Sequence, residues 1–535
     1  MESRLALAVK WLLGPEISSE KSSGHLWPRW IFLRCLGLIY FSAFYALIFQ
    51  IKGMLGPTGI LPAGDYLQAV AAELGSEKFW FAPTLFWFGS SDRALMLVVW
   101  VGLAASVLII FNIWPRASLF VALICFISFV SSAQIFSGFQ SDDMLLEAGV
   151  ISLFFAPPGF LPGLGRAHPA SRASLYMLRW EWFRIYFESG IAKIVSHDYS
   201  WRHLTAMDDY YQNAPLPTWI GWYMGHLPHW FHAFTSFYTL LIELALVFLV
   251  FLPRPFRLAC FWIFSPFQLV ISFTQNYTFL NHIVFSLGIL VLDDRSIEWL
   301  IPQRLRAFIE GKTAAGNRIV EDWYARWRRH LAPMRMAFSG VCLGWLFYVT
   351  AAWLLWYVAP DLSIPRKPAE LLGPLRIADR YGLFANMTHE RREIEFQGSP
   401  DGITWTPYLF RYKPQDPEKA PGIYAPYQPR FEWDLWFASL ESWPNNHFVI
   451  ATQERLLQND RDVLELFQSN PFPKAPPLRV RAVVYQYWFT DMKTKRETGM
   501  WWDRQLLGDY SPPLEREPDG RIFMIDRPTV SSPPD

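Results

Sequence analysis

The sequence predicts a polytopic α-helical membrane domain of about nine spans followed by a β-sandwich-like soluble domain. Of its 535 residues, 52% are hydrophobic and 17% aromatic, too many for an ordinary soluble globule. Apolar runs near the length of about 20 residues that crosses a bilayer recur through the first two thirds of the chain, whereas the last third is polar and rich in proline. We therefore expect a transmembrane domain over residues 1–360 and an extracytoplasmic β-rich domain over 361–535.

Nine segments fit membrane-spanning helices. Seven are clearly apolar: Trp30–Ile51, Ala94–Ile113, Ala117–Ser137, Asp143–Phe160, Trp230–Leu252, Phe256–Phe273 and Arg335–Val358. Two are weaker, because Tyr176–Val195 is interrupted by charges and Thr278–Leu292 is short.

The distribution of basic residues predicts the orientation. Nine crossings with a cytoplasmic N-terminus place every basic loop inside, as the positive-inside rule requires. The largest of these loops, 301–335, contains Arg304, Arg306, Lys312, Arg318, Arg326, Arg328 and Arg329. The loops 52–93, 138–142, 196–229 and 274–277 and all residues after 358 then share the outer face.

Several classes of function lack support in the residues. The net charge of +1 gives nucleic-acid binding no electrostatic basis. Cys35, Cys125, Cys260 and Cys342 all fall in apolar runs, so we expect neither disulfides nor thiol exchange. His226, His229 and His232 are spaced three apart, but no partner ligand is placed beside them, so we predict no metal and no cofactor.

Charged residues interrupt the apolar segments, where an ionisable group is costly and often functional. Arg184 and Glu188 are four apart and share a helix face, so they can pair. Lys193 can reach Glu147 or Glu243 on a neighbouring helix. Two interpretations stay open: these pairs fix helix packing, or they surround a substrate pocket.

A polar, aromatic loop lies between two apolar segments. It runs from Trp201 to Tyr211 (WRHLTAMDDYY) and continues through Pro215-Leu216-Pro217 to Trp222-Tyr223. Plain connectors are short and made of small polar residues, so this composition indicates a function.

The C-terminal region reads as β-rich. Glu393–Gly398 and Thr404–Tyr412 flank an Asp-Gly turn and predict a hairpin, Val480–Phe489 predicts a further strand, and Pro429–Ala438 and Asp462–Gln468 predict short helices. Its aromatic side chains either bind an unfolded or hydrophobic client, or dock on the membrane domain or the headgroup layer.

Seven segments resemble motifs of the lipase maturation factor family. In the apolar part they are Gln140–Gly149, Arg179–Lys193, Trp201–Tyr211 and Asn276–Asn281, the last followed by Leu292-Asp293-Asp294. In the polar part they are Tyr381–Thr388 (YGLFANMT), Tyr427–Ala438 (YQPRFEWDLWFA) and Tyr485–Phe489 with Trp501-Trp502.

The resemblance implies a membrane-anchored maturation factor, or chaperone, that helps secreted lipases or other exported client proteins to fold or assemble in contact with membrane lipids. Eukaryotic members are endoplasmic reticulum proteins that act largely through the C-terminal region, without known catalytic residues. Here Ser200 stands where vertebrate members tend to have Cys, and the tail Ser-Ser-Pro-Pro-Asp is not a retention signal. We therefore expect a bacterial inner-membrane protein with a periplasmic C-terminal domain, which would be lumenal in a eukaryote.

Two functions are weighed. In the leading one the protein is not an enzyme, and its candidate client-binding residues are Trp201, Arg202, Tyr211, Trp433, Trp436, Tyr487 and Trp488. The alternative starts from a distant similarity of the membrane part to the vitamin K-dependent carboxylase group, in which a membrane-embedded lysine is a base. A lipid, quinone or peptide would then react in a pocket surrounded by Lys193, Glu188, Arg184 and His203.

Overall fold

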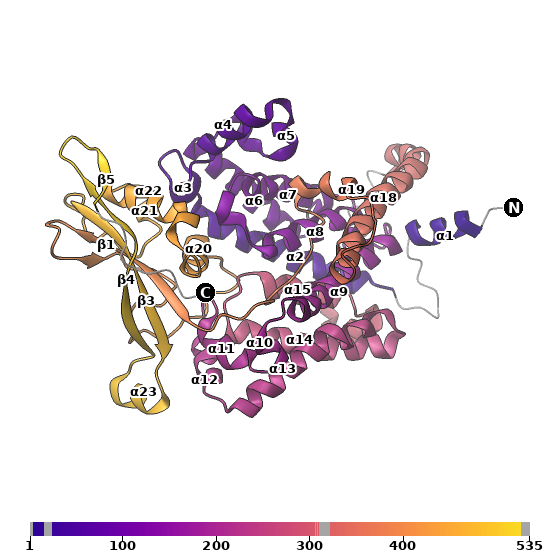
Figure 1. Ribbon diagram of the computed structural model, residues 1–535. Coiled ribbons are helices and arrows are strands. Elements are labelled where there is room, and N and C mark those ends of the chain that lie inside the picture. The colour runs from indigo at the N-terminus through magenta and orange to yellow at the C-terminus, as the bar shows by residue number, and fades with distance from the viewer. Residues whose placement is uncertain (1–3, 15–23, 305, 308, 310–320, 526–535) are drawn as a thin grey trace.

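The structure, a computed structural model, describes residues 4–14, 24–304, 306, 307, 309 and 321–525 (Figure 1). Lys312 and Arg318 of the largest basic loop lie outside the described residues. A helical region and a C-terminal region with a β-sheet lie side by side, and helices of the C-terminal region lie between the helical region and part of the sheet (Figure 1).

All nine predicted spans are helical. The corresponding helices are α2 (Leu26–Ile48), α6 (Asp92–Ile110), α7 (Pro115–Val130), α8 (Gln140–Phe155), α9 (Arg172–Val195), α13 (His229–Leu244), α14 (Arg254–Thr274), α15 (Leu280–Ile289) and α18 (Glu321–Val358). Helix α13 continues into the 3-10 segment η4 (Leu246–Phe251). Among the described residues five helices are long and apolar enough to cross a membrane: α2, α6, α13 with η4, α14, and the part of α18 from Pro333. The other four are shorter or carry charges.

Short helices precede, connect or follow these long ones. They are α1 (Arg4–Leu13), α3 (Ile51–Leu55), α4 (Ala63–Leu74), α5 (Lys78–Phe81), α10 (Tyr199–Arg202), α11 (Ala206–Asn213), α12 (Trp219–Gly225), α16 (Asp294–Ile297) and α19 (Lys367–Glu370).

Successive long helices run in alternating directions. The ends that contact the C-terminal region belong to residues such as Gln50 after α2, Asp142 at the start of α8, Ser196 after α9 and Asn276 between α14 and α15. The opposite ends carry basic side chains: Arg116 donates to Ala156 O over 2.5 Å, Arg254 pairs with Asp293 at 2.5 Å, and Arg257 donates to Val291 O over 2.9 Å. One end of the helical region is thus basic, and the other holds the C-terminal region.

The C-terminal region is a single antiparallel sheet with the order β2-β1-β3-β4-β5. Its strands are β1 (Arg391–Ser399), β2 (Thr406–Pro407), β3 (Arg479–Phe489), β4 (Trp502–Arg516) and β5 (Ile522–Met524). Helices α20 (Arg430–Ser439), α21 (His447–Leu457) and α22 (Arg461–Leu464) lie between this sheet and the helical region, and α23 (Met492–Thr498) connects β3 to β4 (Figure 1).

The predicted sandwich is wrong in its second layer. Within the described residues there is one sheet, and helices α20 and α21 cover the face on which a second sheet was expected. The predicted return strand Thr404–Tyr412 shortens to β2, because Tyr408 and Phe410 leave the sheet to fill the core against Phe467 and Phe431.

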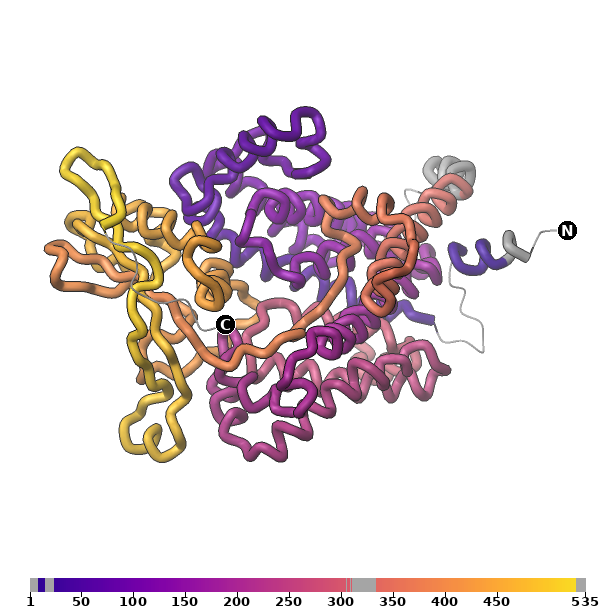
Figure 2. Tube along the Cα trace, viewed as in Figure 1, coloured from indigo at the N-terminus to yellow at the C-terminus, as the bar shows by residue number. Residues whose placement is uncertain are grey.

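The chain crosses between the two regions along the helical surface. After α19 it passes the ends of α8 and α9 before it enters β1 (Figure 2). We call residues 376–388 the linking segment. It contains no helix or strand, so its backbone polar groups need partners from elsewhere.

Candidate functional site

A buried ionic network binds the start of the linking segment. Arg184 pairs with Glu147 of α8 and, at 3.6 Å, with Glu188 on its own helix, as the four-residue spacing predicts. Arg184 also donates to Asp379 O over 2.9 Å. The Tyr381 hydroxyl donates to Glu147 Oε2, and the Tyr381 N–H to Glu188 Oε2, each over 2.7 Å. Each carboxylate therefore joins the arginine to the linking segment.

Lys193 extends this arrangement toward the end of α9. Of its two predicted partners it pairs with Glu243 of α13, at 2.9 Å. Its ammonium also donates to Leu383 O over 2.9 Å and lies 5.1 Å from the ring centre of Trp201. Lys193 is thus enclosed by its counter-ion, a backbone carbonyl and an aromatic ring, which is how a buried cation is stabilised.

Residues around α10 bind the rest of the linking segment. The Asp198 carboxylate accepts the N–H of Met387 over 2.9 Å and that of Ser200 over 2.7 Å. Burial opposes its ionisation, but these backbone donors outweigh burial and lower the pKa of Asp198. Trp201 Nε1 donates to Phe384 O over 2.9 Å, and Ser196 Oγ to Ala385 O over 2.8 Å. Both ends of the linking segment are therefore bound.

Arg430 of α20 forms the second contact between the regions. Its guanidinium makes two bonds to Asp142, of 2.7 and 2.8 Å, and a third of 2.8 Å to Phe136 O. It lies 4.7 Å from the ring centre of Phe129, and neither Arg430 nor Asp142 is exposed. Both belong to segments that carry the family resemblance, one from each region.

Asn276 and Arg391 make the third contact. Asn276 donates to Leu216 O and Gly422 O, and accepts the N–H groups of Tyr424 and Ala425, at 2.6–3.1 Å. Arg391 donates to Gln212 O over 2.8 Å, Ala214 O over 2.5 Å and Pro215 O over 2.9 Å. The predicted polar loop thus connects two helices of the helical region to β1.

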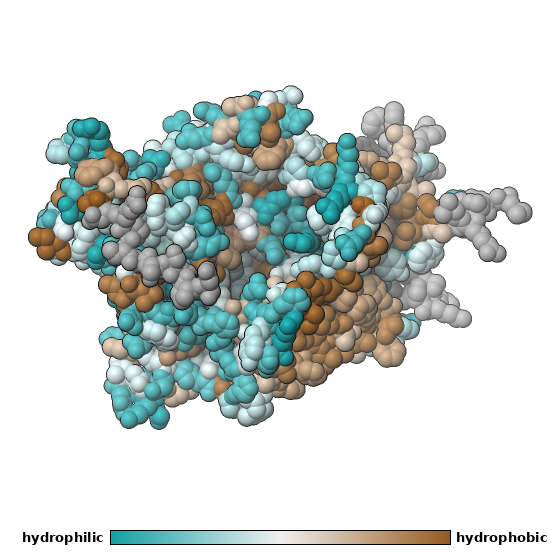
Figure 3. Space-filling model, in the orientation of Figure 1, coloured by the Kyte–Doolittle hydropathy of each residue, from teal (hydrophilic) through white to brown (hydrophobic). Residues whose placement is uncertain are grey.

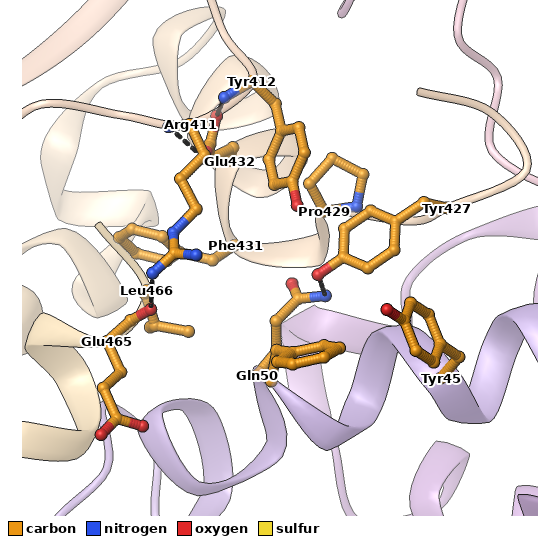
Figure 4. Close-up of a pocket in the computed structure, with 11 residues that line it drawn as sticks. Tyr45, Gln50, Arg411, Tyr412, Tyr427, Pro429, Phe431, Glu432, Glu465 and Leu466 are labelled. Atoms are coloured by element: carbon orange, nitrogen blue, oxygen red, sulfur yellow. Dashed lines mark hydrogen bonds between the residues drawn. The ribbon is translucent and has the colours of Figure 1, made fainter. Parts of the chain in front are cut away.

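A hollow of about 220 Å³ opens beside the contact made by Arg430, whose N–H donates to Gln50 in its wall (Figure 4). Tyr45 and Phe49 of the helical region are 44% and 51% exposed beside it, and Tyr412 and Tyr427 face them from the C-terminal region. Deeper in, Glu432 accepts the N–H groups of residues 411–413 at 2.6–3.0 Å; burial raises the pKa of Glu432 to about 7 against these donors. The hollow can receive an apolar or aromatic side chain.

The candidate catalytic residues do not surround one pocket. A cavity of about 350 Å³ lies among α9, α11, α13, α14 and α15, and of the four candidates only Lys193 lines it. Arg184 and Glu188 are in the ionic network, and His203 is exposed with its ring stacked 3.7 Å from that of Tyr199. The pocket expected for the enzymatic alternative is therefore not assembled from these side chains.

Most of the candidate client-binding residues are buried, and two of them lie in the junction between the regions. Trp433 and Trp436 are 8% and 9% exposed; Trp433 packs 5.4 Å from Phe139, and Trp436 Nε1 donates to Asn213 O over 3.1 Å. The positions of these two rings therefore agree with docking of the C-terminal region on the helical region. Trp201, Tyr211 and Tyr487 are also buried, whereas Arg202 and Trp488 are exposed.

The three histidines that are spaced three residues apart contact side-chain and backbone groups of the protein itself. His229 and His232 each contact Asp208, at 2.8 and 2.9 Å, and His226 lies between Trp222 O and Thr490 O at 2.7 and 2.8 Å. Within the described part of the chain, no group of three metal-ligating side chains could hold an ion.

Sequence reasoning missed Arg391, Asp379 and Ser189 as junction residues. Ser189, which is next to the predicted Glu188, accepts the N–H of Leu383 over 3.2 Å, and the backbone carbonyl of Asp379 accepts from Arg184. Nothing in a single sequence indicates these distant partners. Burial raises the pKa of Asp379 to about 6, with Arg376 acting in the opposite direction.

The comparisons with known proteins agree on one family. Residues 27–299 match the family described as lipase maturation factor transmembrane domain, and residues 377–512 match the lipase maturation factor C-terminal domain. The chain is 32% identical to lipase maturation factor 1 of Bos taurus over 525 residues, which cover 94% of this chain and 92% of the relative. It is 30% identical to the Homo sapiens protein of that name (94% and 91% covered) and 29% to lipase maturation factor 2 of Gallus gallus (91% and 81%). No solved structure matches the chain.

Proposed function

Because the chain belongs to the lipase maturation factor family, we propose that it is a membrane-anchored maturation factor that assists the folding or assembly of secreted lipases or other exported proteins. One observation carries the mechanism: charged side chains of α9, paired with carboxylates of α8 and α13, bind the backbone of the linking segment. The helical region is then a rigid mount that presents the C-terminal region to clients.

The client surface consists of exposed side chains beside the junction. We place it on Arg202, Trp488 and the hollow edged by Tyr45 and Phe49, which are exposed next to buried, fixed neighbours. The buried candidates Trp201, Tyr211, Trp433, Trp436 and Tyr487 act indirectly, because they hold this surface in place. Large exposed aromatic rings on a rigid support suit the recognition of apolar segments in incompletely folded proteins.

The topology follows the nine helices. We infer nine crossings, a cytoplasmic N-terminus, a transmembrane domain over 1–360 and an extracytoplasmic domain over 361–535, in the bacterial inner membrane or, in a eukaryote, the endoplasmic reticulum. The alternation of helix directions supports this, as does the basic character of the end away from the C-terminal region. A single cysteine at Ile403, which is 83% exposed, should react with an impermeant maleimide added to intact spheroplasts; protection of that cysteine contradicts this topology.

The function is tested by complementation of a deletion strain. Secreted lipase activity per unit of lipase protein is measured at matched membrane levels. A truncation after residue 360 and Trp488→Ala should both lower this ratio, whereas Trp299→Ala, a matched tryptophan 73% exposed at the opposite end, should leave it unchanged. Full activity with the truncation overturns the proposal.

Variants of Lys193 distinguish a docking role of this residue from a chemical role of its ammonium group. Lys193→Met leaves Glu243 buried without its counter-ion and should impair maturation. The double variant Lys193→Met/Glu243→Leu removes the buried unpaired charge but still leaves Leu383 O without its donor, so a docking role predicts partial recovery. If the double variant is as inactive as the single one, the ammonium group itself is required.

A further inference from the structure

The cavity lined by Lys193 is not used by the proposed function. It lies behind the linking segment, and most of its wall is aromatic or aliphatic, with contributions from Tyr186, Met207, Phe231, Phe267, Ile271 and Val284. Its volume of about 350 Å³ falls at the lower end of the about 300–1,000 Å³ of small-molecule sites.

The cavity opens sideways between α13 and α14. Phe234 of α13 and Val270 of α14 both line it, and they are 57% and 50% exposed. The two helices meet through η4, but α13 then packs on α9 and α11 while α14 packs on α15 and α12. Pro266, within α14, also lines the cavity. The opening is therefore a gap between two helices that diverge from η4.

The surface around this opening is apolar. Both helices are among those long and apolar enough to cross a membrane, and they expose Phe237, Trp262, Leu269 and Phe273. The space-filling view shows a broad hydrophobic surface in the region of α14, in contrast to the hydrophilic C-terminal region (Figure 3). In a bilayer, the opening would face acyl chains rather than water.

Most of the polar groups in the wall are paired within the protein, although Gln268 Oε1 is buried without a hydrogen-bond partner. Thr235, Thr239 and Thr274 donate their hydroxyls to carbonyls of their own helices. Lys193 and Glu243 neutralise each other. Gln268 donates to the Tyr186 hydroxyl over 2.7 Å. The wall therefore offers no net charge and little polar recognition, and cavities of this kind bind apolar ligands.

We propose that this cavity takes one acyl chain of a bilayer phospholipid, which enters between α13 and α14 and leaves its headgroup in the membrane. The lateral opening fixes the source of the ligand, the apolar wall fixes its chemistry, and the volume limits it to a single chain. Leu383 and Phe384 of the linking segment form part of the wall. A bound chain thus contacts the segment that carries the C-terminal region.

Photolabelling of the full-length protein tests the proposal. The protein is placed in phosphatidylcholine nanodiscs that contain a trace of phosphatidylcholine with a diazirine in one acyl chain, and labelled residues are mapped by mass spectrometry. We expect labels on inner residues of the cavity such as Met207, Ile271 and Phe384 as well as on outer residues such as Trp262.

Variants whose larger side chains fill the cavity provide the control for the labelling experiment. Thr239→Phe and, independently, the more accessible Thr235→Phe should abolish the inner labels and keep the outer ones, which also reports that the protein is folded. Leu269→Phe adds an aromatic ring to the outer face of α14 and should change neither set. Inner labels that persist in both filled variants, or labels confined to the outer face of the wild type, overturn the proposal. Inner labelling by a diazirine fatty acid but not by the phospholipid overturns the assigned source.

Discussion

Replacement of Arg430 by Met tests whether the two regions dock through buried charge. Met approximates the length of the side chain but leaves the Asp142 carboxylate buried without the two bonds that it now accepts. Removal of one partner of a buried ion pair costs about 3–5 kcal/mol. We therefore expect the equilibrium between docked and undocked states to shift roughly a hundred- to several-thousand-fold toward undocking.

Hydrogen exchange of α20 measures this shift. Its amides exchange when the helix separates from the helical region, so their exchange in detergent-solubilised protein should accelerate by the same factor. Arg461→Met is the matched control: Arg461 is 90% exposed in its pair with Glu465, and such pairs contribute about 0–1 kcal/mol. Exchange of α20 at the wild-type rate in Arg430→Met would refute the reasoning.

The double variant Arg430→Met/Asp142→Leu completes the cycle. Replacement of a whole buried pair by apolar residues is often neutral, so much of the loss should be recovered. The neighbouring Asp434 does not prevent this, because burial raises its pKa well above the usual range and favours its neutral form. A double variant that undocks as far as the single one would show that Arg430 acts through contacts other than Asp142.

Three further predictions concern the linking segment and the polar loop. Tyr381→Phe leaves Glu147 Oε2 without its 2.7 Å donor and should destabilise the linking segment by about 1–3 kcal/mol, seen as faster exchange of the Leu383 amide; an unchanged rate contradicts this. Asn276→Ala removes the partners of Gly422 O and of two N–H groups, and should lower the melting temperature more than Asn470→Ala, whose side chain bonds locally. Burial raises the pKa of Asp379 to about 6, so folding favours its protonated form: this contribution is present below pH 4 and is lost as the pH rises through about 6. The melting temperature should therefore fall less between pH 5 and pH 7 in Asp379→Asn than in the wild type, and parallel curves would exclude this titration.

The helices were predictable because a run of apolar residues within one segment is enough to indicate each of them. Apolar length identified every long helix, and β1, β3 and α20 appear where alternation and helix-forming residues indicated them. Strand β4 was missed because Pro512 and Pro513 argue against a strand; the structure accommodates this stretch with irregular register opposite Val480–Ala482. The sandwich was wrong because alternation identifies a buried sheet face but not whether helices or strands cover it.

The site was predictable only in its short-range pairs. The i,i+4 spacing predicted Arg184 with Glu188, and Glu243 was one of two partners considered for Lys193. The partners that define the role of these residues, Asp379 O and Leu383 O, lie about 190 residues away and are backbone groups, which no residue type can reveal. Similarly, an aromatic run such as Phe431–Phe437 has the same composition whether it binds a client or an adjacent domain.

The charges buried next to the linking segment are there because this segment has no helix or strand to pair its own backbone groups. Without a helix or strand of its own, it presents N–H and carbonyl groups to a poorly hydrated surface, where each unpaired group costs about 1–3 kcal/mol. Carboxylates can accept its N–H groups and cations can donate to its carbonyls, but each charge also needs a counter-ion to be tolerated there. The pairs Arg184–Glu147 and Lys193–Glu243 meet both requirements, since each neutralises itself and still contacts the linking segment. Docking of the linking segment therefore accounts for these two buried ion pairs.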